Sequence, residues 1–287
     1  MWRLLFLILP AFSSDLPTLT DVQLREWKVL LHYRRASIGE EKSEADSPGF
    51  FFSANGKTKA EEELQATILA MDPDSPIRLG ELKQHPQCAF PLRWQFIKNH
   101  FKTDYSDVEC RDFLSWKNSF RAQSVTMVYA APFFGSPASM FGHTFLRIDS
   151  LPRGQNEKSD LLDYGIGFEA NPDSSFDPFY IVKGLLGGYE GRFFQYPYHL
   201  KVNSYNDLEA RDLWEYQLNF SSQEIDRLLS HIWEMGQARF DYFFFDENCS
   251  YHLLSLLEAA RPTLDLRHRF GVMAIPSDTI RILFEEN

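Results

Sequence analysis

The hydrophobic periodicity of this chain changes once, near Ser124. Upstream, residues 20–23 have the form of a capping box, and apolar residues follow at helical spacing, namely Leu24, Trp27, Leu30 and Leu31. Further helices are predicted from Thr58 and around Trp94. Downstream, apolar and polar residues alternate, which predicts strands over 125–130, 142–149 and 161–168. A helical half followed by a strand-rich half predicts the α+β class.

The first residues predict export. One positive side chain, Arg3, precedes an apolar run over 4–12, and two serines follow it. A run this short is typical of a secretory signal peptide rather than of a membrane-spanning helix, which requires ~20 apolar residues. The alternative is a buried N-terminal strand. We therefore expect a signal peptide over 1–14, a helical N-terminal region over 15–122 and a catalytic domain over 123–287, in the periplasm or cell envelope.

The charge of the chain excludes one class of partner. A formal net charge of -11 and a pI near 5.2 disfavour binding to a phosphate backbone, because affinity there comes from lysine and arginine. We therefore expect no nucleic acid among the partners.

Export makes the three cysteines informative, because thiols tend to pair in an oxidising compartment. Cys88 and Cys110 lie in the same N-terminal region, and a disulfide between them would close a loop worth ~3 kcal/mol. Cys249 is then left over. An unpaired thiol in an exported chain is buried and inert, joined to another molecule, or kept reactive.

Two interpretations of Cys249 stay open at this point. Asn248 is a favoured N-cap, which places Cys249 in the first turn of a predicted helix over 249–260, where the helix dipole stabilises a thiolate. Asp246 and Glu247 oppose that effect by repulsion. Alternatively, Cys249 is a small core residue, because it begins a series at helical spacing with Leu253, Leu256 and Ala260.

His143 is the better candidate base among the histidines. It follows Gly142 at the beginning of a predicted strand, although a single strand histidine is more often structural. His252 lies on the same helix as Cys249, where it is poorly placed to face a substrate carbonyl beyond the thiol. Cys249 and His252 also have the spacing of half a zinc site. Since no second pair stands at ligand spacing, we expect no metal and no cofactor.

The segment over 183–201 combines glycines with aromatic residues. This composition suits a lid or a membrane-facing flap, and equally a buried β-hairpin. The segment from Ser221 onward, in contrast, predicts an amphipathic helix with its own capping box.

Two segments resemble the signature blocks of the Lnb N-terminal periplasmic domain family: residues 137–147 (PASMFGHTFLR) and 244–254 (FFDENCSYHLL). Residues 52–58, 183–191, 196–201 and 211–216 fit as well, so the resemblance covers most of the mature chain. It implies a permuted papain-like (NlpC-type) core, with a small antiparallel sheet packed on the cysteine helix after a helical N-terminal subdomain. It also implies that Cys249 is a thiolate nucleophile and His143 its base.

The residue that orients the base is left open. Gly167 occupies the place where the family pattern has an asparagine, so Glu169 or Tyr164 is the candidate substitute. Asn248 is a further candidate member of the catalytic group. Tyr164, Arg192 and Tyr196 are the candidate substrate-binding residues.

Lnb-type proteins are lipoprotein N-acyltransferases, so the resemblance implies transfer of an acyl chain from a phospholipid, through a thioester on Cys249, to a lipoprotein amine. The expected partners are a phospholipid donor, a lipoprotein acceptor and the membrane surface. Two alternatives remain: a cell-wall peptidase or amidase of the NlpC type, and a non-catalytic envelope module that binds lipid or protein. The sequence predicts that a catalytic Cys249 lies beside His143 and that a core Cys249 lies far from it.

Overall fold

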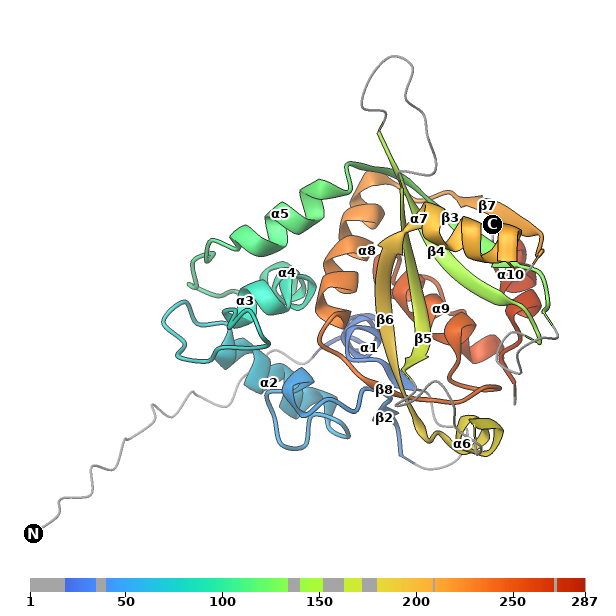
Figure 1. Cartoon of the computed structure of the whole chain (residues 1–287). Helices are drawn as coiled ribbons and strands as arrows, with labels where there is room; N and C mark the ends of the chain where they lie inside the picture. The colour runs from blue at the N-terminus through green and yellow to red at the C-terminus, as the bar shows by residue number, and fades with distance from the viewer. Residues whose placement is uncertain are drawn as a thin grey trace, which may run out of the picture.

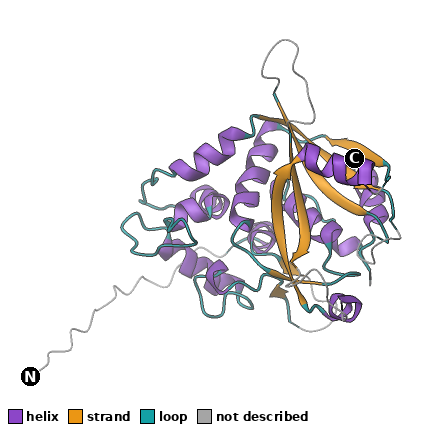
Figure 2. Ribbon diagram, viewed as in Figure 1, coloured by secondary structure: helices purple, strands orange, loops and turns teal. Residues whose placement is uncertain are grey.

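The computed structural model describes residues 19–34, 40–133, 140–151, 163–171, 180–208, 210–270 and 273–286. The predicted signal peptide and the start of the first family-like block lie outside these residues. The described chain has the α+β architecture predicted from the sequence, with helices around one large antiparallel sheet (Figure 2).

The main sheet has six strands in the order β7-β3-β4-β5-β6-β8, and every neighbouring pair is antiparallel. The strands are β3 (Ala122–Ala130), β4 (His143–Ser150), β5 (Tyr164–Asn171), β6 (Tyr189–Pro197), β7 (Leu213–Leu218) and β8 (Phe240–Tyr242). The strands predicted over 125–130 and 142–149 are therefore confirmed as β3 and β4. The third is confirmed as β5, with its bounds moved toward the C-terminus.

The segment over 183–201 forms regular structure. It contributes the end of α6 (Tyr180–Leu186), strand β6 between β5 and β8, and α7 (Tyr198–Val202). The sequence left open a lid or flap and a β-hairpin. Tyr189–Pro197 is a strand, but it pairs with β5 and β8 and forms no hairpin within the segment. The flanking glycines serve close packing: a Cβ added at Gly184 would meet the Phe244 ring at 2.2 Å.

Helices surround the sheet (Figure 1). The remaining ones are α1 (Asp21–Leu30), α2 (Ala60–Ala70), α3 (Pro86–Ala89), α4 (Pro91–His100), α5 (Arg111–Ser119), α8 (Ser222–Met235), α9 (Cys249–Ala260) and α10 (Pro276–Glu285). Both predicted capping boxes are present, at Thr20 and Ser221. None of the described helices is both long and apolar enough to span a bilayer.

The two faces of the sheet have different covers. Helices α8 and α9 pack on one face, where α9 lies against β4 and β5, and α7 lies on the other (Figure 1). A small apolar cluster lies under α7 and the π-helical turn Asn203–Leu208 that follows it; its members are Val128, Ala130, Phe145, Tyr198 and Tyr205. Every residue of α9 is buried, so this helix is the centre of the molecule.

The N-terminal region shares its core with the strand-rich region. Helix α1 packs against α4 and α9, and Ala45 forms a β-bridge with Phe240 of β8. The short strands β1 (Tyr33–Arg34) and β2 (Lys42–Ser43) pair with each other beside this bridge. One apolar cluster consequently extends from Trp27 to Ile282.

The predicted disulfide is confirmed. Cys88 of α3 and Cys110, the residue before α5, are bonded with their Cα atoms 5.1 Å apart. Cys249 is the free cysteine, and it is buried.

Candidate active site

The first turn of α9 lies where strands β4 and β5 separate. Their paired residues run from Ile148–Tyr164 to Leu146–Ile166 and stop there, so the first residues of β4 lack β5 as a neighbour. The Thr144 backbone N–H donates instead to the sulfur of Cys249. The Thr144 hydroxyl lies 3.0 Å from that of Ser250. These contacts hold the first turn of α9 against the first residues of β4.

Asn248 fixes the start of α9. Its Oδ1 accepts from the N–H groups of Ser250 and Tyr251, and its Nδ2 donates to the carbonyls of Phe244 and Ala274. The predicted N-cap is thus confirmed, and its amide is fully used in holding the loop and the helix together. In this structure Asn248 is a positioning residue for Cys249.

Cys249 and His143 lie side by side. Cys249 is only 4% exposed, and burial alone would raise the pKa of its thiol. The imidazole of His143 acts against burial through its charge and a hydrogen bond, and Thr144 and Ser250 add to its effect, so the pKa of Cys249 is lowered to about 7. The thiol is therefore ionised in part at neutral pH. A core cysteine far from His143, the sequence-based alternative, does not have these contacts.

Glu169 lies on the other side of the imidazole. Its Oε1 is 3.9 Å from Nε2 of His143, and it is also 2.5 Å from Nζ of Lys201. Burial alone would raise the pKa of Glu169, but His143 and then Lys201 lower it below its ordinary value. Nε2 of His143 has no hydrogen-bond partner among the described residues, so its contact with Glu169 is one of charge alone. The chain thus places a thiol, an imidazole, a carboxylate and an ammonium in a row.

The glycine at position 167 is explained by Tyr196. A Cβ added at Gly165 would meet the Tyr196 ring at 2.1 Å, and one at Gly167 would meet its hydroxyl at 2.9 Å. Tyr196 therefore lies flat over both glycines, in the space that an asparagine side chain at position 167 would need. Burial first, and then the charge of Glu169, raise the pKa of Tyr196, so its phenol remains neutral. Tyr196 thus lies close to Glu169 and Cys249, and its predicted role in substrate binding stays a prediction.

The other two predicted substrate-binding residues do not reach the thiol. Tyr164 pairs with Ile148 at the opposite end of β5, and its ring packs on Phe120. Arg192 is the cross-strand neighbour of Glu169, but its guanidinium pairs with Glu190.

A small apolar pocket adjoins Cys249. Two aromatic loops and the start of α10 form it, and its lining residues are Phe141, Gly142, Tyr242, Phe244, Phe245, Asn248, Cys249, Ala274, Ile275 and Pro276. Asn248 is its one strongly polar side chain, and that amide is already satisfied. The cavity is only about 10 Å³, so in this structure it has room for the reacting atoms beside the thiol and not for an acyl chain.

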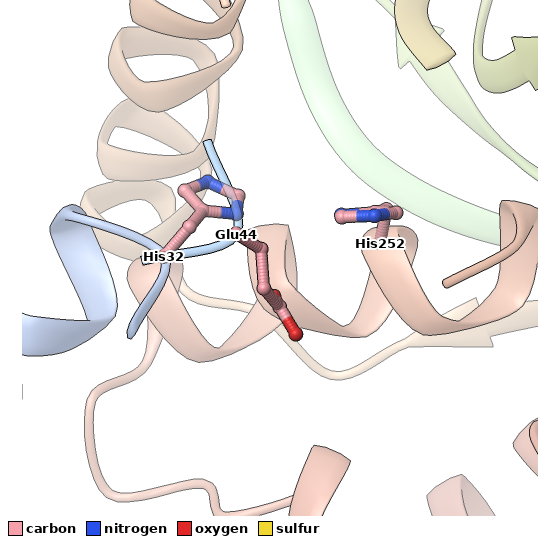
Figure 3. A group of neighbouring side chains, drawn as sticks. All are labelled: His32, Glu44 and His252. Carbon is pink, nitrogen blue, oxygen red and sulfur yellow. The ribbon is translucent and has the colours of Figure 1, made fainter. Parts of the chain in front are cut away.

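His252 is not part of this arrangement. Its ring lies between Phe168 and Phe240, at centroid distances of 4.1 and 4.5 Å. It instead belongs, with His32 and Glu44, to a separate buried group of potential metal ligands (Figure 3).

Comparison with known families gives the site a context. Residues 112–286, more than half of the chain and including His143, Glu169, Lys201 and Cys249, match the Lnb N-terminal periplasmic domain. The chain belongs to this family. Residues 22–100 of this Lnb-type chain match a domain of unknown function (DUF7843). No curated protein and no solved structure matched the chain.

Sequence reasoning about the Lnb-type chain missed three members of the site. Lys201 lies in a block that fits the family, but nothing in its spacing indicates a contact with Glu169. Thr144 and Ser250 are direct neighbours of the predicted pair, and a polar residue at each of these positions is the signal that could have revealed them.

Proposed function

We propose that this Lnb-type chain is a thiol-dependent acyltransferase, which moves an acyl chain from a phospholipid to the N-terminal amine of a lipoprotein. The observation that carries the proposal is the combination at Cys249 of a thiol with a pKa of about 7, the neighbouring His143 imidazole and mostly apolar surrounding residues. A hydrolase acting on cell-wall peptides would require an open polar cleft at the same place.

The first half-reaction transfers the acyl group to sulfur. The Cys249 thiolate attacks the ester carbonyl, and the backbone N–H of Cys249, which the Asn248 cap leaves unused, donates to the resulting oxyanion. The carbon–oxygen bond of the ester then breaks. The departing alcohol takes the proton from the His143 imidazolium, and the enzyme holds a thioester.

The second half-reaction restores the thiol. The lipoprotein α-amine attacks the thioester carbonyl, neutral His143 takes a proton from the amine, and the carbon–sulfur bond breaks to give an amide and the thiolate. Glu169 supports the positive imidazole at each stage through its charge.

The surface beside the pocket supports a membrane-bound substrate. Gly184 of α6 packs on Phe244, a pocket residue, and its carbonyl accepts from the Phe244 N–H. The opposite side of α6 exposes Val182, Leu185 and Leu186. An exposed apolar helix face at the rim of the pocket suits contact with lipid tails.

The test is an assay of the purified chain with phospholipid vesicles and a synthetic peptide that carries an N-terminal lipidated cysteine with a free amine. We expect an N-acylated peptide with the wild type and none with Cys249→Ser or His143→Gln. Glu190→Gln, a change on β6 away from the thiol, serves as the control and should retain activity. Release of free fatty acid without peptide acylation would favour a lipase, and no lipid turnover by the folded protein would reject the proposal.

A further inference from the structure

A second polar group lies in the core, away from the thiol. His32 follows α1, Glu44 follows β2, and His252 lies on α9 one turn after Cys249. One potential ligand atom from each lies within 4.8 Å of the other two. Figure 3 shows the Glu44 side chain between the two imidazoles. Both imidazoles are 0% exposed.

A chain of hydrogen bonds assigns the tautomer of His32. The Glu234 carboxylate accepts from the N–H groups of Leu92 and Arg93 and lies 2.9 Å from Nδ1 of His231. His231 must therefore carry its proton on Nδ1, which makes its Nε2 an acceptor. That nitrogen lies 3.0 Å from Nε2 of His32, so His32 carries its own proton on Nε2.

This assignment leaves a bare lone pair on Nδ1 of His32. Nδ1 has no hydrogen-bond partner among the described residues. A buried acceptor without a partner is costly and calls for a physical explanation.

His252 is also buried and also lacks hydrogen-bond partners among the described residues. Neither of its ring nitrogens has a partner in the described part of the chain. Aromatic rings pack around it, so water has little access. Two buried imidazoles thus present nitrogens without hydrogen-bond partners in the described structure to one small region.

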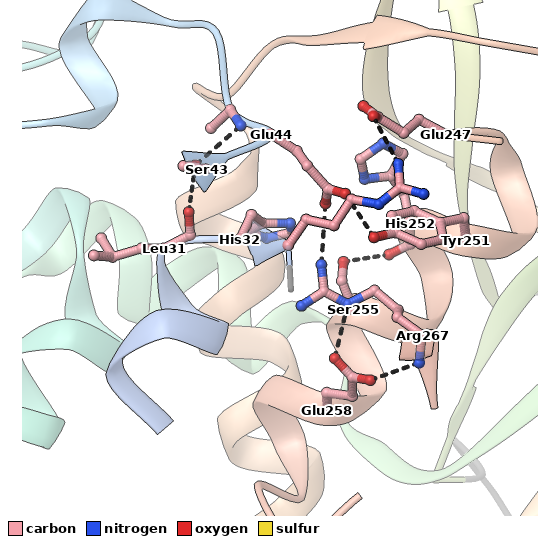
Figure 4. A network of polar contacts seen from close by, with 12 residues as sticks. Leu31, His32, Ser43, Glu44, Glu247, Tyr251, His252, Ser255, Glu258 and Arg267 are labelled. Carbon is pink, nitrogen blue, oxygen red and sulfur yellow. Dashed lines mark hydrogen bonds and ion pairs between the residues drawn. The ribbon is translucent and has the colours of Figure 1, made fainter. Parts of the chain in front are cut away.

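Glu44 supplies an oxygen ligand of opposite charge to a cation. Tyr251 donates to its Oε1 at 2.6 Å, and Arg267 donates to its Oε2 at 3.0 Å. Each carboxylate oxygen keeps a further lone pair. Figure 4 shows how this carboxylate joins a wider network with Glu247 and Glu258.

The network carries more negative than positive groups. Its carboxylates are Glu44, Asp246, Glu247 and Glu258, and the guanidinium groups that pair with them are those of Arg34 and Arg267. A divalent ion would balance the excess.

We propose that His32, Glu44 and His252 form a binding site for a divalent transition metal of the zinc class. Two imidazole nitrogens and one carboxylate oxygen are an established ligand set for such ions. The hydrogen bond from His32 through His231 to Glu234 is the outer support that metal-bound histidines normally have. Tyr251 and Arg267, which donate to Glu44, also line a surface pocket.

The metal would join two parts of the chain. His32 and Glu44 lie within the segment that matches the domain of unknown function, and His252 lies within the Lnb-type segment. The ion would tie the N-terminal segment to the helix that carries Cys249. The ion would have a structural role. The thiol of Cys249 lies at the start of α9 and is in contact with His143 and Thr144 of β4 rather than with the proposed ligands.

The test uses untagged full-length mature protein, because a histidine tag would itself bind metal. After treatment with a chelator and dialysis, zinc binding is measured by competition with a chromophoric chelator, and Co²⁺ is added as a spectroscopic probe. We expect one ion per chain, a visible Co²⁺ absorption band and a higher melting temperature with zinc. His32→Gln and His252→Gln should abolish these effects, and His231→Gln should weaken zinc binding by roughly 10–100-fold.

His268→Gln is the matched control, since His268 is half exposed and pairs with Asp265 outside the cluster; it should bind zinc like the wild type. Two results would overturn the proposal. One is a folded wild-type protein that binds no zinc at micromolar concentration. This result does not depend on whether the variants fold. The other is zinc binding that survives in a folded His252→Gln protein.

Discussion

Nε2 of His143 lies 3.9 Å from Oε1 of Glu169, and the same oxygen lies 2.5 Å from Nζ of Lys201. Glu169 therefore forms a close ion pair with Lys201 and a longer-range contact with His143. It stabilises a positive imidazole by its charge rather than through a hydrogen bond, which fits a residue that substitutes for the asparagine missing at position 167.

Glu169→Gln tests the contact with His143. Without the negative charge, the imidazolium of His143 is less stable, so the apparent pKa of Cys249 should rise above 7 and alkylation at pH 7 should slow several-fold. The measurement is the rate of iodoacetamide labelling from pH 5 to 10. Glu190→Gln should leave that profile unchanged. An unshifted profile in Glu169→Gln would remove Glu169 from the site.

His143→Gln should have a larger effect on the same profile. His143 opposes the burial that would raise the pKa of Cys249, so its loss should return that pKa to 9.0 or above. The thiolate fraction at pH 7, and with it the alkylation rate, should fall by about 50-fold or more, because the pKa moves by two units. A rate within threefold of the wild type would mean that the imidazole does not ionise the thiol.

Asn248→Asp keeps the helix cap of α9 but adds a negative charge beside Cys249. An aspartate still accepts from the N–H groups of Ser250 and Tyr251, but it cannot donate to the carbonyls of Phe244 and Ala274. Its buried charge should raise the pKa of Cys249 and lower stability by about 1–3 kcal/mol. Asn248→Ser, which keeps a neutral acceptor, should leave the labelling profile in place. Urea unfolding and alkylation measure the two effects.

The Thr144–Ser250 contact anchors the thiol to β4. Thr144→Val leaves a buried Ser250 hydroxyl without its partner and should cost about 1–3 kcal/mol, and Ser250→Ala should cost a similar amount. The double variant should be less destabilised than the sum of the two, since both polar groups are gone. Strict additivity in urea unfolding would show that the two hydroxyls do not interact.

Elements with local signals were predictable from the sequence. Helices α1 and α8 carry capping boxes, and α9 begins after Asn248 at the predicted residue. The pairing of Cys88 with Cys110 followed from their number and region. In each case the deciding interaction lies within a few residues along the chain or is covalent.

Features that depend on distant contacts could not be predicted. The segment that leads into β6 has the composition of a loop because Gly184 and Gly187 make room for the rings of Phe244 and Phe243, and Gly191 of β6 makes room for a ring of β5, which no local pattern encodes. The contact between the start of β4 and the first turn of α9 joins residues about 100 positions apart. The His32–Glu44–His252 group is drawn from three parts of the chain without any metal-ligand spacing, so the sequence pointed to no metal.

The most direct test of the proposed acyl transfer is the mass of the protein after incubation with phospholipid vesicles. Because Cys88 and Cys110 are joined, Cys249 is the one thiol among the three cysteines, and an adduct on sulfur is unambiguous. We expect the wild type to gain one acyl chain that hydroxylamine removes, and Cys249→Ala to gain none. An unmodified wild type, or an equal adduct on Cys249→Ala, would contradict a thioester mechanism at Cys249.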